Sequence, residues 1–177
     1  MAVLNVIKMG NPILREEAKE FTKEEILSDE TTQLIQDLYD TMKAEGGIGI
    51  AAPQVGISRS VALINIEDGQ SRYSDAQEFP LLKIFNPKIK VLDETSQGFW
   101  EGCLSVPGLR GYVERPRKVE ISFLNEKAEP QIIEVEDFLA TVFQHELDHL
   151  FGKLYVDRIK DITLLSYDDE LSQVLSK

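Results

Sequence analysis

The sequence predicts a protein of the α+β class, in which antiparallel or mixed β-sheets pack around a buried central helix. Two observations lead to this prediction. The middle of the chain holds several short segments rich in Val, Ile and Phe, which alternate in part with polar residues as half-buried strands do. A later segment is apolar over most of the circumference of a helix, a pattern that is typical of a buried helix.

The first half of the chain predicts two helices. The dipeptide Asn11-Pro12 predicts a short helix that continues to Ala18, with the asparagine as N-cap and the proline at the first helical position. Apolar residues recur at helical spacing between residues 34 and 42 and predict a second helix, which ends by Gly46-Gly47. Residues 47–56 are too interrupted by glycine and proline to form a helix.

Strand patterns follow, and the chain becomes helical again near its end. Residues 125–130 are expected to connect a hairpin, and the polar residues 69–80 to form a surface loop. From Asp137 the apolar spacing is helical, with Gly152 as the C-terminal cap, and residues 161–175 form a last amphipathic segment. The four expected strands are residues 60–66, 83–92, 118–124 and 131–135.

Composition fits one domain that works in the cytoplasm. A length of 177 residues is typical of one domain, so we expect residues 1–177 to fold as a unit. The chain has 31 acidic and 19 basic residues and a net charge of −12, which repels phosphate backbones and anionic lipids. We therefore expect neither nucleic acid nor a membrane as a partner. The single cysteine excludes an internal disulfide, and the N-terminal sequence does not resemble a signal peptide.

The strongest chemical signal is the segment 145–149, which reads His-Glu-Leu-Asp-His. Histidines four residues apart project from the same face of a helix, so His145 and His149 can bind one metal. Glu146 then lies beside that metal and can act as a general base. The alternative is a pair of purely structural histidines. The chain has only two histidines and both fall in this segment, which favours the metal site.

A third ligand is needed, and the chain offers two candidates. A lone cysteine is commonly a small buried apolar residue. Beside two histidines with metal spacing, however, the Cys103 thiolate would complete a three-ligand site with an open fourth position, as in catalytic zinc sites. Such a metal lowers the pKa of a water molecule and makes hydroxide available near neutral pH. The other candidate is Glu170, the remaining downstream glutamate that a zinc endopeptidase could use.

Hydrolysis also needs hydrogen-bond donors for the oxyanion that develops on the attacked carbonyl. The side chain of Gln54 is one candidate, and the backbone N–H of Leu104 is another. The position of Gln54 alone favours an ordinary loop residue.

Three segments together resemble the signature motifs of the peptide deformylase family, in the same order. Residues 47–54 read Gly-Ile-Gly-Ile-Ala-Ala-Pro-Gln, residues 101–105 read Glu-Gly-Cys-Leu-Ser, and residues 144–149 read Gln-His-Glu-Leu-Asp-His. The similarity covers nearly the whole chain, so it implies a single peptide-deformylase-like domain. It implies hydrolysis of the N-formyl group from formyl-methionine on nascent polypeptides near the ribosome, with release of formate.

The resemblance also implies a cofactor and a role for individual residues. It assigns metal ligation to Cys103, His145 and His149. It assigns the acid/base role to Glu146, and stabilisation of the oxyanion to Gln54 and the Leu104 N–H. One divalent metal per chain is expected. The resemblance implies Fe(2+), which the family usually binds, with Ni, Co or Zn as alternatives.

The substrate is expected to contact small and apolar residues. The glycines at 47 and 49 leave room for a peptide backbone, which could pair as an added strand. An apolar pocket would suit the thioether of methionine, although large apolar residues are often simply core. Arg110 could contact the peptide further along or be a plain surface charge. The residues expected to bind substrate are Ile48, Gly49, Phe99, Gly102, Arg110, Phe138 and Val142.

Two other functions make different predictions. A zinc endopeptidase with a downstream carboxylate ligand would not need Cys103 for metal binding. A metal-stabilised binding module would need a fourth protein ligand and would hydrolyse nothing.

Overall fold

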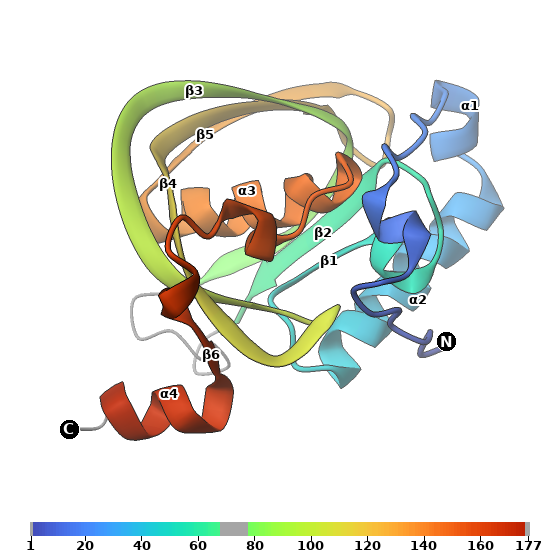
Figure 1. The fold of residues 1–177 in the computed structure, drawn as a ribbon. Helices are drawn as coiled ribbons and strands as arrows, with labels where there is room; N and C mark the ends of the chain where they lie inside the picture. Colours follow the sequence, from blue (N-terminus) through green and yellow to red (C-terminus); the bar gives the residue numbers. More distant parts are fainter. Residues whose placement is uncertain (1, 68–77, 176–177) are drawn as a thin grey trace.

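The structure is a computed structural model of the chain, and it describes residues 2–67 and 78–175. Its strands form an antiparallel sheet with the order β1-β2-β3-β4-β5, and β6 adds to β4 (Figure 1). This arrangement confirms the predicted α+β class with antiparallel pairing. The strands are β1 (Gly49–Ala51), β2 (Val61–Ile66), β3 (Phe79–Cys103), β4 (Val106–Leu124), β5 (Pro130–Glu136) and β6 (Leu165–Tyr167).

The four predicted strands are present, but β3 and β4 are much longer than expected. The prediction ended the second strand at Leu92, because the polar run that follows has no apolar alternation. In the structure β3 continues to Cys103, paired with β4 and interrupted by register shifts near Asp93. Backbone hydrogen bonds to β4 keep residues 93–103 extended, although their side chains do not show the alternation typical of a strand. The two strands bend round α3, the helix Asp137–Leu150 (Figure 1).

The short predicted helix after Asn11 is only one turn of 3-10 helix, Pro12–Arg15. Its start is as expected, since the Asn11 side chain accepts a hydrogen bond of 3.1 Å from the Ile13 N–H. It does not reach Ala18, because the Ala18 N–H donates to the Leu150 carbonyl at 2.9 Å instead. The Ala18 N–H is therefore not available for the hydrogen bond that a longer helix would need.

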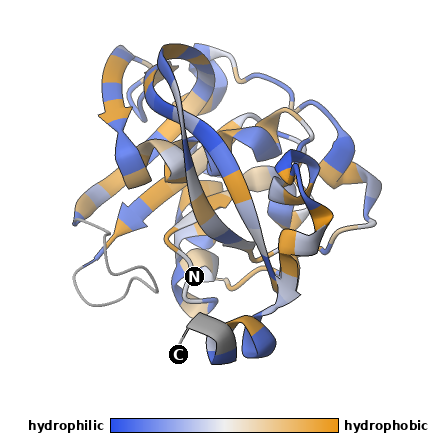
Figure 2. Cartoon of the chain, turned by 60° about the vertical axis from the view of Figure 1, so that its left-hand side comes forward, coloured by the Kyte–Doolittle hydropathy of each residue, from blue (hydrophilic) through white to orange (hydrophobic). Residues whose placement is uncertain are grey.

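Helices α2 (Asp29–Ala44) and α3 pack on opposite faces of the sheet. The predicted second helix is α2, which begins after the N-cap Ser28 and is followed by Gly46 with a φ of 66°. A short helix, α1 (Lys23–Ile26), precedes it. Apolar residues of α2 pack with those of β1 and β2 in one core cluster, and a second cluster joins the sheet to α3. Hydrophobic and hydrophilic residues alternate along the strands (Figure 2).

Helix α3 (Asp137–Leu150) carries both histidines and is almost completely enclosed. Of its 14 residues, all but Asp137 and Leu139 are buried. The helix contacts β1, β2, β4 and β5. Gly152, the predicted cap, has a φ of 68°, and a Cβ there would lie 2.6 Å from the Arg15 carbonyl oxygen. Only glycine therefore fits this turn.

The amphipathic segment predicted over residues 161–175 consists of several short elements. It forms a 3-10 turn (Ile162–Leu164), then β6, then α4 (Asp168–Leu175). The chain is extended at β6 because it pairs with the edge that β4 offers at Leu109–Gly111. Most of the predicted loop 69–80 lies outside the described residues, and its last two positions belong to β3. Within the described ranges, no helix is long and apolar enough to cross a membrane.

Candidate metal centre and active site

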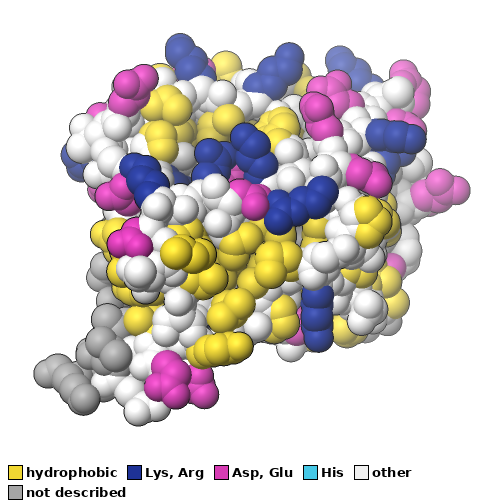
Figure 3. All heavy atoms as spheres, in the orientation of Figure 1, with side chains coloured by type: hydrophobic (Ala, Val, Ile, Leu, Met, Phe, Trp, Pro, Cys, Tyr) yellow, Lys and Arg dark blue, Asp and Glu magenta, His cyan; other side chains and the backbone are white. Residues whose placement is uncertain are grey.

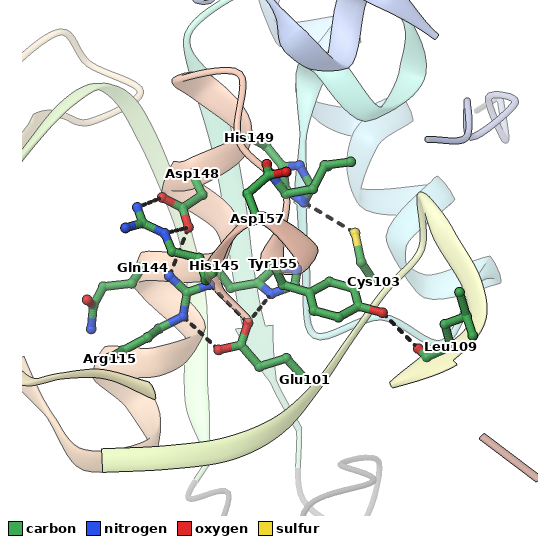
Figure 4. Close-up of polar contacts among 12 residues, drawn as sticks. Glu101, Cys103, Leu109, Arg115, Gln144, His145, Asp148, His149, Tyr155 and Asp157 are labelled. Carbon is green, nitrogen blue, oxygen red and sulfur yellow. Dashed lines mark hydrogen bonds and ion pairs between the residues drawn. The ribbon is translucent and has the colours of Figure 1, made fainter. Parts of the chain in front are cut away.

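The structure brings Cys103, His145 and His149 together, although β3 and α3 are far apart in the sequence (Figure 4). Cys103 is the last residue of β3, and the two histidines lie one turn apart on the buried face of α3. One ligand atom from each residue can be chosen so that all three lie within 4.8 Å of one another. The Cys103 Sγ and the His149 Nε2 are 3.4 Å apart.

These donors fit a divalent metal in both distance and chemistry. A tetrahedral metal with sulfur at about 2.3 Å and nitrogen at about 2.0 Å holds those two atoms about 3.5 Å apart. Burial alone would raise the pKa of the Cys103 thiol, but His149 and His145 outweigh it and lower that pKa to about 5. The thiolate is the form that binds metal. In the part of the chain that the structure describes, no fourth protein ligand joins this group.

A buried network fixes the orientation of His145. Its Nδ1 lies 2.8 Å from a Glu101 carboxylate oxygen, which leaves its Nε2 as the free ligand atom. Arg115 in turn donates to Glu101 at 2.6 and 3.0 Å and to Asp148 at 2.8 Å. Only 2% of the Arg115 side chain is exposed, so its charge is compensated within the protein. Arg158 also donates to Asp148.

Sequence reasoning missed this network. Asp148 stands inside the His-Glu-Leu-Asp-His segment and Arg115 stands on β4, but no spacing rule connects the two positions. The sequence offered one signal, because charged residues next to metal ligands often form hydrogen bonds that orient those ligands. Their pairing depends on how β4 lies against α3.

Glu146 points into the same centre from α3. It is 6% exposed, and its Oε2 has no hydrogen-bond partner among the described residues. Burial raises the pKa of its carboxyl group, while the neighbouring imidazoles of His145 and His149 act in the opposite direction. A Cβ on Gly49 would lie 2.4 Å from the Glu146 Oε1, so the carboxylate packs directly on this glycine.

Gln54 is held in place beside Cys103 and is not an ordinary loop residue. It is 1% exposed and lies on a 3-10 turn, Ala52–Val55. Its Oε1 accepts from the Ala51 N–H at 2.9 Å, which turns its Nε2 toward the Cys103 Sγ at 3.5 Å and the Ser105 hydroxyl at 3.4 Å. Leu104 lies in the two-residue turn between β3 and β4 and lines the same pocket.

A pocket of about 300 Å³ opens beside these groups, in the size range of small-ligand sites. The Phe99 and Phe138 rings meet edge to face in its apolar wall, with centroids 5.4 Å apart. His149, which is deeply buried, is the one predicted site residue that does not line it. Neither histidine is visible on the face in Figure 3. The predicted residues in the wall are Ile48, Gly49, Gln54, Phe99, Gly102, Cys103, Leu104, Arg110, Phe138, Val142, His145 and Glu146.

The pocket wall also contains residues that sequence reasoning did not name. Thr141 lies one turn before His145, and Glu45 follows the end of α2. Asp168, the first residue of α4, forms an ion pair of 3.0 Å with Arg110. Arg110 is therefore not a plain surface charge.

The downstream carboxylate that an endopeptidase would need is not at the centre. Glu170 is an exposed residue of α4 and does not belong to the Cys-His-His group. Tyr155, which stands where some metalloproteases have a third histidine, is buried and stacks on His145 with ring centroids 6.0 Å apart. Its hydroxyl donates to the Leu109 carbonyl at 3.1 Å.

Comparison with known proteins identifies relatives over almost the whole length of the chain. The family model for polypeptide deformylase matches residues 3–164. A curated peptide deformylase of Leptospira biflexa is 43% identical over 171 residues, which are 97% of this chain and 96% of that protein.

Solved structures agree with this match. A Met-Ala-Ser-bound class I type b peptide deformylase of Acinetobacter baumannii is 39% identical, with a TM-score of 0.85, and covers 89% of this chain and 99% of that one. A peptide deformylase of Synechococcus elongatus in complex with actinonin is 36% identical, with a TM-score of 0.79. It covers 99% of this chain and 86% of its own. These matches do not support the endopeptidase alternative.

Proposed function

This chain belongs to the polypeptide deformylase family, and we propose which of its residues carry out the reaction of that family. The family removes the formyl group from the N-terminal methionine of nascent polypeptides by metal-dependent hydrolysis. We propose that residues 1–177 act as one catalytic domain, in the cytoplasm and near the ribosome, around the helix that carries His145 and His149.

Cys103, His145 and His149 hold the metal, and their mutual distances support this assignment. Glu101 keeps the His145 ring in the orientation that presents its Nε2. A divalent metal bound by these residues lowers the pKa of a water molecule and polarises the formyl carbonyl. One metal per chain is expected, with Fe(2+) as the proposed ion and Ni, Co or Zn as substitutes.

An iron enzyme has a distinctive behaviour in air. Fe(2+) and the Cys103 thiolate are both oxidisable, so activity should decay during aerobic purification. It should persist when Ni replaces the iron. Activity assays of aerobically and anaerobically prepared protein, with metal content measured on the same samples, test this identity.

Glu146 moves the proton. Its carboxylate accepts a proton from the attacking water and then delivers it to the amine as the formyl C–N bond breaks. An amine leaves poorly unless it is protonated, so both transfers matter. The raised pKa of the buried carboxyl group supports the proton transfer to the amine, because a more basic carboxylate retains the proton until the C–N bond breaks.

Gln54 and the Leu104 N–H stabilise the oxyanion. The Gln54 amide is fixed before substrate arrives, because its oxygen is already bound to the Ala51 N–H. A preorganised donor of this kind needs no reorganisation during the reaction, and removing one commonly costs about 3–4 kcal/mol of barrier.

The methionine side chain occupies the apolar part of the pocket, between Ile48, Phe99, Phe138 and Val142. The peptide backbone passes Gly49 and Gly102, and Arg110 lies further out. The related Acinetobacter baumannii enzyme was solved with Met-Ala-Ser bound, which supports a pocket for methionine here.

The observation that carries this proposal is that Cys103, His145 and His149 lie together, with Glu146 in the wall of the same pocket as Cys103 and His145. Its test is formate release from formyl-Met-Ala-Ser by anaerobically purified protein. We expect formate from this peptide, and acetyl-Met-Ala-Ser serves as the control, from which no acetate is expected. Metal-loaded protein that released no formate would overturn the proposal.

A further inference from the structure

The C-terminal segment contributes a charged residue to the wall of the pocket. Strand β6 pairs with β4 at Leu109–Gly111, and Asp168 follows it directly as the first residue of α4. The side chain of Asp168 lines the same pocket as the proposed catalytic residues. The family model matches only residues 3–164, so this residue lies beyond the matched range.

The strand register explains why Asp168 meets Arg110. Arg110 on β4 lies opposite Ser166 on β6, and Asp168 is two residues further along. Because Asp168 directly follows the strand that pairs with β4, it lies within reach of the long Arg110 side chain. The Arg110 Nε donates to the Asp168 carboxylate at 3.0 Å, and the two side chains are 12% and 47% exposed.

Arg110 is also confined on its other side. A Cβ at Gly102 would lie 3.0 Å from the Arg110 Nε, so the guanidinium packs over the backbone next to Cys103. The cation is thus held between the Gly102 backbone and the Asp168 carboxylate. Its position depends on the C-terminal segment.

The mouth of the pocket carries an excess of negative charge. Glu101, His145 and Glu146 belong to the buried inner part. The other charged lining residues are Glu45, Asp168 and Arg110. Asp168 offsets the positive charge of Arg110, and the exposed Glu45 is left in excess.

We propose that Asp168 is a specificity-determining residue, which makes this enzyme favour formylated peptides with a basic side chain over those with an acidic one at the first or second position after the methionine. The proposal rests on the proposed function and adds a preference to it. A basic side chain meets the partly exposed Asp168 carboxylate, whereas an acidic one is repelled by it and finds Arg110 already neutralised. One charge at an exposed site changes kcat/KM by about twofold to fivefold.

The test compares kcat/KM for peptides that differ only in one charge. The pairs are formyl-Met-Lys-Ser against formyl-Met-Glu-Ser, and formyl-Met-Ala-Lys against formyl-Met-Ala-Glu. Wild-type protein should prefer the Lys peptide in at least one pair, and that preference should weaken as salt is added. Formyl-Met-Ala-Ser serves as the neutral reference, because its hydrolysis separates a failure of this proposal from a failure of the deformylase assignment.

Variants at the start of α4 localise the effect. Asp168→Asn should reduce the Lys-to-Glu ratio by about twofold to fivefold, and Asp168→Glu should retain most of it. The control is Asp169→Asn, which removes the same charge from the next, exposed residue, outside the pocket wall, and should leave the ratio unchanged. The proposal is wrong if the wild type has no charge preference, if both Asn variants reduce the ratio equally, or if Asp168→Glu loses it as fully as Asp168→Asn.

Discussion

Gly49 lies against the Glu146 carboxylate, which occupies the space that a larger side chain would need. The Glu146 Oε1 would lie 2.4 Å from a Cβ at this position, far inside contact distance. The glycine-rich segment therefore does more than admit a peptide backbone. It also determines the position of the Glu146 carboxylate, the proposed general acid/base.

Gly49→Ala should displace the Glu146 carboxylate and reduce deformylation without loss of metal. A misplacement of about 1 Å can cost about 10²-fold in rate. The measurement is a double-mutant cycle of formate release with Gly49→Ala, Glu146→Ala and the double variant. If Gly49 acts through Glu146, the double variant should be no slower than Glu146→Ala alone. Fully additive losses would mean that Gly49 acts elsewhere, for example on the substrate backbone.

The long hairpin of β3 and β4 carries Cys103 and Arg115 to the site. Its length is the feature of the fold that the sequence predicts least well. Helix α3 was predictable because its apolar periodicity is local to its own sequence. The extension of β3 beyond Leu92 was not, because the exposed polar residues there are kept extended by backbone bonds to β4. The same long-range pairing brings Cys103 to α3 and Arg115 to Glu101.

Arg115→Leu should destabilise this element and weaken metal binding. It would leave the buried Glu101 and Asp148 carboxylates without their shared cation, a change that typically costs about 3–5 kcal/mol. Loss of an outer partner of a ligating histidine typically lowers metal affinity by about 10- to 100-fold. Urea unfolding and metal competition measure the two effects.

The matched control is Arg117→Leu on the same strand. Arg117 pairs with Asp137, and both side chains are about half exposed. Such a pair contributes about 0–1 kcal/mol, so this variant should unfold near the wild-type midpoint and keep its metal. Equal effects of the two substitutions would mean that the buried network has no special role.

Across the whole molecule, the metal would bind two segments that lie far apart in the sequence. Its proposed ligands come from the end of β3 and from α3, and the pocket around them draws on residues from Glu45 to Asp168. Two of the three motifs predict the proposed ligands, because each motif is a contiguous stretch of sequence. The contributions of Arg115 and Asp168 depend on tertiary pairing, and no local pattern predicts them.

Removing the metal should therefore lower the melting temperature. A ligand present at about 100 times its dissociation constant adds about 2.7 kcal/mol to stability. In a protein of this length that corresponds to a shift of roughly 5–10 °C. Calorimetry of protein before and after chelation measures it.

Cys103→Ala should contain no metal and should not respond to added metal. Full metal occupancy in this variant would contradict the three-ligand assignment.

The most direct test of the proposed mechanism measures metal content and formate release on the same sample of Glu146→Ala. The carboxylate lies beside the ligands without belonging to the Cys-His-His group, so its removal should leave the metal in place. We predict a full complement of metal, a fold unchanged from the wild type, and a loss of at least ~10²-fold in turnover of formyl-Met-Ala-Ser. Glu146→Asp should fall between the two. A Glu146→Ala protein with full metal and near-normal turnover would contradict the account.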